Sequence, residues 1–174
     1  MRIVVDGYNL IRQSDALKKI DKFSIEAGRR ELIKRLARYS RHRGHRITVV
    51  FDGWMAGSPT EEREVVGGIT VIYSKRGEKA DEVIKRLVRL TGEETVVVTS
   101  DRDVADAASR AGAVAVPAPL FEARLDETRP VKEVDNDTAL NDEDDEIRHD
   151  TKKKGPARRI SRKKRLAATK IKKL

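Results

Sequence analysis

The sequence predicts an α/β fold, a three-layer α/β/α sandwich around a mainly parallel central sheet. Short apolar segments of strand length alternate with longer segments of helical period along residues 1–126. Two of the apolar segments lead directly into an aspartate, at Asp6 and Asp52, and a third leads through Ser100 into Asp101. One of them, residues 95–99, is rich in β-branched residues throughout, as is typical of a central parallel strand. The alternation also favours right-handed crossovers between parallel strands.

The first predicted strand lies within the opening ten residues, MRIVVDGYNL. Residues 3–5 form an apolar run that stops at Asp6, after which Gly7 turns the chain. Open α/β sheets bind their ligands at the carboxyl ends of their strands, so Asp6 is a candidate site residue. Residues 10–23 show a mixed pattern, and there we expect a loop with a short helical turn.

A helix is predicted from Ser24, as its N-cap, to about His42, because apolar residues recur there at helical spacing. Its other side carries basic residues spaced by four, four and three positions, which aligns them. Such a stripe is either a solvated helix face or a surface that contacts phosphates. The second interpretation makes these residues candidates for substrate binding: Arg30, Lys34, Arg38 and Arg41.

The second predicted strand covers residues 48–51 and ends at Asp52. Residues 54–64 are expected to form a loop, in which Trp54 either anchors the loop or stacks on a base. The two glycines at 67–68 then predict a hairpin turn between residues 65–66 and 69–73.

The remaining elements follow the same alternation. After a polar turn at 75–79, an apolar stripe predicts a helix with Asp81 in its first turn. Strand 95–99 is followed by a helix from 102 to 110, which either Ser100 or Asp101 caps. A last strand is expected at 113–116, where Pro117 and Pro119 stop it, and a final helical turn at 120–125.

Composition divides the chain into a domain at 1–126 and a charged tail at 127–174. The chain is 38% hydrophobic and 39% charged, and the apolar residues are concentrated in the first part. The tail holds an acidic block followed by a basic block, a pattern typical of disorder. The net charge of +9 indicates either a polyanionic partner or simply a soluble basic protein. The domain contributes +4 and the tail +5, so the tail is either an RNA- or ribosome-binding arm or a segment whose two blocks pair.

Acidic residues at one sheet edge suggest a cation site. Each aspartate alone could cap a helix or form an Asx turn. Together they repel one another unless a cation neutralises them, and oxygen ligands select Mg²⁺ or Mn²⁺. The chain has no cysteine, which excludes thiol catalysis and zinc–thiolate sites. A divalent ion beside a basic surface suits phosphodiester hydrolysis, because it activates water and neutralises phosphate charge.

Four short motifs resemble the NYN branch of the PIN-like nucleases, and most closely the bacterial YacP-like group. They are DGYNLI from Asp6, FDG at 51–53, GEKADE at 77–82 and TSDRD at 99–103. The resemblance covers residues 1–126. It implies a compact PIN-like fold and a Mg²⁺- or Mn²⁺-dependent endoribonuclease that acts on RNA, in this group on messenger RNA in association with the ribosome.

The same resemblance assigns roles to single residues. It implies that Asp6, Asp81 and Asp101 bind the metal ion and that Asp52 is a fourth catalytic acid. Either Asp103 or Asp106 would complete the metal-binding acids. Asn9 would orient Asp6 or contact the phosphate, and Ser100 would support the site or contact the phosphate.

Two other functional classes remain open from the sequence. One is an RNA- or ribosome-binding module that keeps the PIN-like fold without cutting, although a binding surface would favour neutral or basic residues at the four acidic positions. The other is a phosphohydrolase or a receiver-like signalling domain, which would need a lysine at a suitable distance from the acids. No signal peptide or membrane span is evident, because Asp6 interrupts the first apolar run, so we expect a cytoplasmic protein without a membrane partner.

Overall fold

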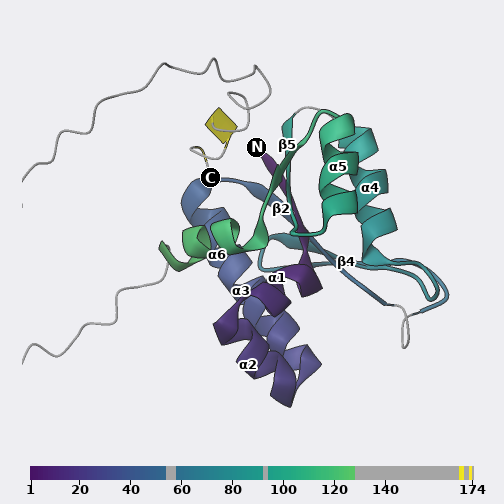
Figure 1. Cartoon of the computed structure of the whole chain (residues 1–174). Helices are drawn as coiled ribbons and strands as arrows, with labels where there is room; N and C mark the ends of the chain where they lie inside the picture. Colours follow the sequence, from purple (N-terminus) through teal and green to yellow (C-terminus); the bar gives the residue numbers. More distant parts are fainter. Residues whose placement is uncertain (54–57, 92–93, 128–168, 171–172, 174) are drawn as a thin grey trace, which may run out of the picture.

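The computed structural model describes residues 1–53, 58–91, 94–127, 169–170 and 173, and it confirms the predicted α/β/α sandwich (Figure 1). Its sheet has six strands in the order β3-β4-β2-β1-β5-β6. All neighbouring strands are parallel except β3, which pairs antiparallel with β4 at one edge. The strands are β1 (Arg2–Asp6), β2 (Arg46–Phe51), β3 (Glu62–Val66), β4 (Ile69–Tyr73), β5 (Thr95–Val98) and β6 (Val114–Val116).

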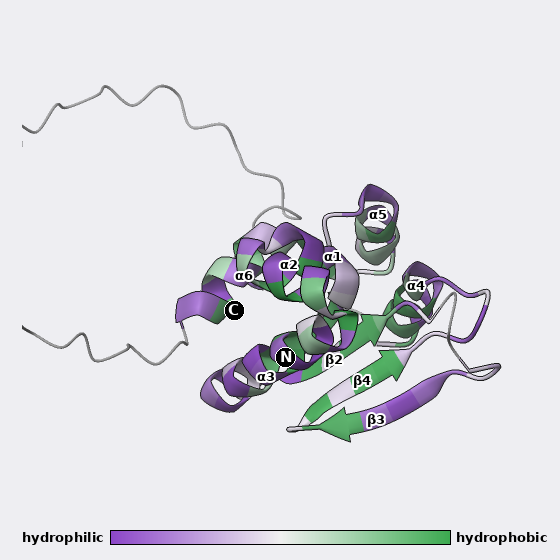
Figure 2. Ribbon diagram, turned by 90° about the horizontal axis from the view of Figure 1, so that it is seen from below, coloured by the Kyte–Doolittle hydropathy of each residue, from purple (hydrophilic) through white to green (hydrophobic). Residues whose placement is uncertain are grey.

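Helices cover both faces of this sheet, and successive strand residues point to alternate faces. Ile3 and Val5 pack in one core and Val4 in the other. Figure 2 shows α4 (Ala80–Thr91) and α5 (Arg102–Arg110) on one side of the sheet, with the other helices on the opposite side. These are α1 (Gly7–Gln13), α2 (Asp15–Phe23), α3 (Ile25–Arg43) and α6 (Ala118–Glu127).

Two of the helices begin at capping residues that the sequence predicted. Ser24 accepts a hydrogen bond from the Ala27 amide at the start of α3, and Gly44 ends that helix with a φ of 68°. At α5 the choice between two caps is resolved in favour of Asp101, whose side chain accepts from two backbone amides. In the described part of the chain, no helix combines the length and the apolar character that crossing a membrane requires.

The expectation of a loop over residues 10–23 was wrong, because α1 and α2 occupy this segment. Asp6 caps α1, and the buried Ser14 caps α2 by accepting a hydrogen bond from the Leu17 amide at 3.2 Å. Leu10 is fully buried. Each helix is shorter than the window over which a helical period becomes evident in a sequence, and only the caps signal them.

Two other boundaries also differ from the prediction. The hairpin at residues 67–68 is confirmed, but β3 begins at Glu62, within the expected loop, whose residues 54–57 lie outside the described part. All residues of β3 are exposed, so this edge strand lacks the apolar alternation that predicts a strand. Helix α6 extends from Ala118 to Glu127 rather than over a single turn, and Pro119 fits its first turn, where no amide donor is needed.

Gly7 permits the close approach of β1 and β2 beside the predicted site. A Cβ atom at this position would lie 2.4 Å from Cε1 of Phe51 and 3.0 Å from the Val50 carbonyl oxygen. The glycine is therefore needed for space at the junction of β1 and α1. This junction places Asp6 at the end of β1 and at the start of the helix.

One described residue of the tail, Lys173, lies at the other end of the sheet. The Lys173 carbonyl oxygen is 3.0 Å from Nε2 of His45, directly before the start of β2. Asp6 and Asp52 lie at the ends of β1 and β2, so this contact is at the opposite edge from them. The prediction of disorder for the rest of the tail concerns residues outside the described part.

Candidate acidic site at the carboxyl ends of the strands

The structure brings four predicted aspartates to one pocket at the carboxyl edge of the sheet. Two of them follow or end β1 and β2, one lies in the first turn of α4, and one caps α5. Four separate segments of the chain therefore contribute one carboxyl group each. The pocket is lined by Asp6, Tyr8, Asn9, Arg12, Asp52, Lys79, Ala80, Asp81 and Asp101.

Asp6 is the most buried of these acids, with 7% of its surface exposed. Its Oδ1 accepts a hydrogen bond from the Asn9 amide at 3.1 Å, and its Oδ2 accepts one from the Thr99 hydroxyl at 3.3 Å. Burial, with smaller contributions from the charges of Asp81 and Asp101, raises the pKa of Asp6 from 3.8 to about 6, against the lowering effect of the two hydrogen bonds. The carboxylate is thus held in place although its charged form is disfavoured.

Thr99 connects two of the acids. It is buried, and its Oγ1 donates to Asp6 while accepting a hydrogen bond from the Asp101 amide at 3.1 Å. Oδ1 of Asp101 in turn accepts from the Asp103 and Val104 amides at 2.8 and 3.1 Å. The carboxyl group of Asp101 is therefore oriented by the first turn of α5, and one hydroxyl sets the spacing of β1 and the β5–α5 turn.

Asp81 experiences the charges of the other acids directly. Burial raises its pKa, and the negative charges of Asp101 and Asp52 raise it further, whereas Lys85 and Lys79 lower it. Lys85 follows Asp81 by one helical turn on α4. The four carboxylates thus form an electrostatically coupled group that a cation would stabilise.

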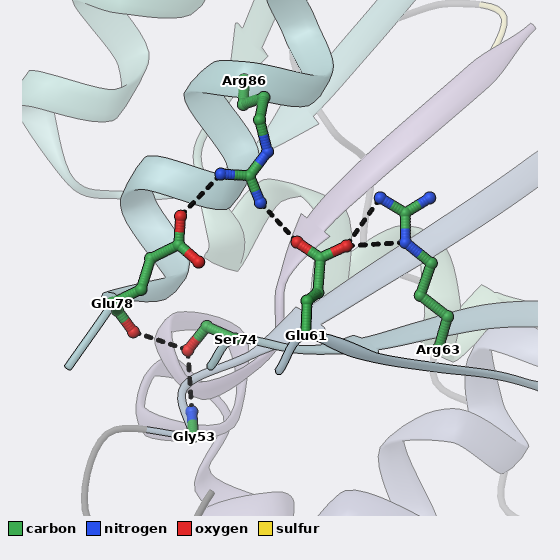
Figure 3. A network of polar contacts seen from close by, with 6 residues as sticks. All are labelled: Gly53, Glu61, Arg63, Ser74, Glu78 and Arg86. Atoms are coloured by element: carbon green, nitrogen blue, oxygen red, sulfur yellow. Dashed lines mark hydrogen bonds and ion pairs between the residues drawn. The ribbon is translucent and has the colours of Figure 1, made fainter. Parts of the chain in front are cut away.

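Asp52 is positioned by a polar network between β2, β4 and the start of α4. The Ser74 hydroxyl accepts a hydrogen bond from the Gly53 amide at 2.9 Å and donates to the Glu78 carbonyl oxygen at 2.7 Å. Its oxygen lies 3.5 Å from Oδ1 of Asp52. Figure 3 shows Ser74 between Gly53 and the backbone of Glu78. The chain after β2 is therefore fixed to the segment that carries Asp81.

Arg86 holds the outer part of the same network. Its Nη1 donates to Glu78 at 2.6 Å, and its Nη2 donates to Glu61, which also pairs with Arg63 at 2.6 Å (Figure 3). These pairs are partly exposed, so each contributes little to stability by itself. Their geometric effect is to join α4 to the strand β3.

Asn9 and Ser100 also lie at this edge of the sheet. Oδ1 of Asn9 accepts a hydrogen bond from the Ser100 amide at 2.8 Å, and Asn9 lines the acidic pocket. The Ser100 hydroxyl accepts from the Ala118 amide at 3.2 Å, at the beginning of α6. Asn9 is thus placed for contact with a ligand, whereas Ser100 connects α1, β5 and α6.

The structure does not bring the predicted fifth acid to the pocket. Asp103 is exposed, and its Oδ2 lies 2.6 Å from Nζ of Lys85. This ion pair lowers the pKa of Asp103. Asp106 is exposed about one turn further along α5. Both lie outside the lining of the acidic pocket in the described part of the chain.

The basic stripe of α3 is mostly separate from the acids. Helix α3 precedes β2, so its last turn, with Arg41, lies near the amino ends of the strands. Arg30 and Lys34 are exposed, and Arg30 pairs with Glu26 at 2.9 Å. Nε of Arg38 is buried and has no hydrogen-bond acceptor in the part of the chain described. The stripe thus leads away from the pocket along the helix.

Three polar residues of the pocket were given no role in the site by the sequence analysis. Tyr8 and Arg12 lie on α1 and follow the spacing i, i+4, which a helix assignment for residues 7–13 would have placed on one face. Lys79 directly precedes the helix that carries Asp81. The two cations show that the pocket is not purely acidic.

The carboxylate oxygens are suited to a hard divalent ion, and the mutual repulsion at Asp6 and Asp81 is what such an ion would relieve. Among the described residues, no three acidic or histidine side chains are already arranged as a metal site. The donor set therefore fits Mg²⁺ or Mn²⁺ in its chemistry, while closure around an ion requires side-chain movement.

Comparisons with known proteins agree with this fold. A family model described as "YacP-like NYN domain" matches residues 3–173. The "Uncharacterized protein YacP" of Bacillus subtilis (strain 168) is 36% identical over 87 residues, which are 50% of this chain and 51% of that protein. The match thus spans about half the length of this curated relative.

Solved structures with the same architecture extend the comparison. The crystal structure of Rae1 (YacP) from Bacillus subtilis superposes with a TM-score of 0.63 at 30% sequence identity, covering 74% of this chain and 75% of that one. The structure of a mutant of the same protein gives a TM-score of 0.62 at 30% identity, with 74% and 76% covered. The similarity therefore includes most of the described domain.

Proposed function

Because the chain belongs to the YacP-like NYN domain family, whose members are PIN-like nuclease domains, we propose that it is a divalent-metal-dependent endoribonuclease that hydrolyses RNA phosphodiester bonds. The observation that carries this proposal is the convergence of four carboxylates from four segments on one pocket. Within the proposal, the substrate is messenger RNA, cut in association with the ribosome in the cytoplasm.

Asp6, Asp81 and Asp101 are the proposed ligands of Mg²⁺ or Mn²⁺, with Asp52 as a fourth catalytic acid. When bound, the ion would activate water for attack and neutralise charge on the phosphate. The chain's own contribution is orientation: Thr99 and Asn9 fix Asp6, and the first turn of α5 fixes Asp101. Burial excludes water from Asp6 and strengthens its interaction with a cation.

Asp103 remains a proposed metal ligand on one condition. Its carboxylate is paired with Lys85, so it can reach the pocket only after this ion pair opens. Lys85 also lies near Asp81, whose pKa it lowers. We propose that Asp103, once freed from Lys85, would join the acids that hold the ion; Asp106 is the alternative fifth acid.

Substrate contacts are proposed for residues around the pocket and on α3. Arg12 and Lys79 line the pocket and offer positive charge to a phosphate next to the acids. Asn9 is proposed to contact the scissile region and Ser100 to support it. The stripe on α3 would contact RNA away from the cleavage site: Arg30, Lys34, Arg38 and Arg41.

A second candidate function is an RNA-binding module without cleavage. It is favoured by the absence, in the described part of the chain, of three acidic side chains already arranged for an ion. Against it stands the cost of gathering four carboxylates on a surface that would bind a polyanion. A cleavage assay distinguishes the endoribonuclease from the RNA-binding module.

The test is incubation of the purified full-length protein with labelled single-stranded RNA in Mg²⁺, Mn²⁺ or EDTA. We expect cleavage with a divalent ion and none in EDTA. Asp6→Asn, Asp81→Asn and Asp101→Asn should each abolish it, and double variants should lose no more, because the acids act as a unit. Asp15→Asn, an exposed acid on α2, is the control. RNA binding without any cleavage would support the second candidate instead.

A further inference from the structure

An arginine next to the acidic pocket is surrounded by aromatic rings. Cζ of Arg29 lies 5.2 Å from the ring centroid of Tyr8, 5.6 Å from that of Phe51 and 5.5 Å from that of Tyr73. These rings come from the start of α1, from β2 and from β4. Arg29 thus reaches from α3 to the edge of the sheet where the acids lie.

Arg29 is partly buried and pairs with no carboxylate in the described part of the chain. Its hydrogen bonds go to a neutral group instead. Nε donates to Oη of Tyr8 at 2.6 Å, and Nη2 donates to the same oxygen. The guanidinium charge is therefore stabilised by rings and by a hydroxyl, without an ion pair to any carboxylate among the described residues.

These contacts determine what the Tyr8 hydroxyl can do. Its oxygen already accepts two hydrogen bonds, so the O–H group is left as a donor. Tyr8 lines the acidic pocket, and its ring packs edge-on against Phe51 with the two ring centroids 5.4 Å apart. A hydroxyl restricted to donating is unsuited to metal ligation and suited to an anionic acceptor oxygen.

We propose that Tyr8 donates a hydrogen bond to a phosphate oxygen of the RNA, at a linkage adjacent to the scissile one, and that Arg29 is the residue that positions it. The inference rests on the proposed function for its substrate. Arg29 supplies positive charge behind the hydroxyl and keeps the ring in one orientation. The subsite would bind one phosphate without reading the base, because a phosphate carries no sequence information.

A purely structural role for Arg29 makes different predictions. In that case Arg29 only connects α3 to α1, and its loss would lower stability and every activity together. In the proposed role, loss of the Tyr8 hydroxyl weakens RNA binding while the protein still folds, with only the modest loss of stability expected when Arg29 loses this acceptor. The effect is also confined to one phosphate of the substrate.

The experiment combines protein variants with a series of RNAs. Each RNA carries one uncharged methylphosphonate linkage at a different position, and a 2′-O-methyl group on the adjacent ribose protects that linkage from self-cleavage. Binding is measured in Ca²⁺ by fluorescence anisotropy for the wild type, Tyr8→Phe, Arg29→Lys and Arg29→Gln. Tyr73→Phe is the matched control. It removes a hydroxyl from the same cluster of rings, but this hydroxyl donates to Glu64, whereas Arg29 donates to Tyr8. Melting temperatures are recorded for all variants.

We expect Tyr8→Phe and Arg29→Gln to weaken binding about tenfold, Arg29→Lys to recover part of that loss, and Tyr73→Phe to bind normally. One methylphosphonate position should weaken wild-type binding but leave Tyr8→Phe unaffected. Equal sensitivity of the wild type and Tyr8→Phe at every linkage, or no RNA binding at all, would overturn the subsite. If this coupling is found but no cleavage occurs under any condition, the subsite stands and the nuclease proposal fails.

Discussion

The Thr99 hydroxyl donates to Oδ2 of Asp6 over 3.3 Å while it accepts the amide hydrogen of Asp101. One buried side chain directly after β5 therefore contacts one acid through its hydroxyl and holds the backbone of another. The hydrogen bond lowers the pKa of Asp6, although burial has the larger, opposite effect. Removal of this hydroxyl tests whether the acids act as a coupled group.

Thr99→Val should reduce RNA cleavage most at acidic pH. The valine is similar in shape, but Asp6 loses a donor that favours its charged form, so its pKa should rise above about 6. Protonated Asp6 is unsuited to hold a cation, and the pH at which cleavage is half-maximal should move upward. Cleavage rates between pH 5 and pH 8 measure this shift. An unchanged pH profile would show that Asp6 is ionised independently of Thr99.

Asp6→Asn should stabilise the metal-free protein at neutral pH while it abolishes cleavage. The pKa of Asp6 is raised in the folded state, so the folded protein binds more protons than the unfolded chain between pH 4 and 6. Wild-type stability therefore falls as the pH rises through this window. The rise in the pKa of Asp6 from 3.8 to about 6 corresponds to a loss of about 3 kcal/mol in the free energy of unfolding across this window.

Urea unfolding of both proteins at several pH values, in EDTA, measures this difference. The two free energies of unfolding should agree near pH 4, and the variant should be the more stable one above pH 6. Asp15→Asn, at an exposed position, should follow the wild type at every pH. A constant difference between Asp6→Asn and the wild type would contradict the raised pKa.

Mn²⁺ should raise the melting temperature of the wild type, and the increase should be larger at pH 7.5 than at pH 5. Protons compete with the ion for Asp6, and burial and neighbouring acids also raise the pKa of Asp81. An ion present at 100 times its dissociation constant stabilises the folded state by about 2.7 kcal/mol. Differential scanning fluorimetry with Asp81→Asn as the comparison measures the effect, which the variant should largely lack.

The strands and most of the acids were predictable because each depends on a local pattern. Val96 to Val98 form an unbroken buried run in β5, and Asp6 directly follows such a run in β1. A parallel sheet then brings the strand ends together without further information. The start of β3 was not predicted, because all residues of this edge strand are exposed and its sequence therefore does not alternate between apolar and polar residues.

What the sequence left open depends on tertiary contacts. Lys85 and Asp103 lie 18 positions apart, on α4 and α5, and no spacing rule predicts that they pair at 2.6 Å. Arg29 and Tyr8 meet because α3 packs beside α1, and α1 itself was missed. The basic stripe on α3 was visible, but its direction relative to the pocket follows only from the arrangement of α3 and β2.

Gly7→Ala should destabilise the protein by about 1–3 kcal/mol, because the added Cβ would lie 2.4 Å from the Phe51 ring. Displacement of this ring also disturbs Tyr8 and Tyr73, which pack against it. Thermal unfolding measures the loss. The double variant Gly7→Ala/Phe51→Leu should lose less stability than the sum of the losses in the two single variants, because the smaller side chain at position 51 leaves room for the added Cβ. Strict additivity would indicate that the clash is relieved elsewhere.

If the tail is an RNA-binding arm rather than a segment whose two blocks pair, deletion of residues 128–174 should weaken RNA binding at low salt and flatten its salt dependence. The deletion keeps Glu127, which pairs with Arg124 at 3.0 Å at the end of α6. It removes the thirteen Lys and Arg from Arg148 onward, and each phosphate contact on a single strand adds about 0.7 to the salt slope. Cleavage of a short RNA at saturating concentration should persist, since all four pocket aspartates remain. Binding isotherms over a salt series measure the slopes, and equal slopes would show that the tail's charges are satisfied internally.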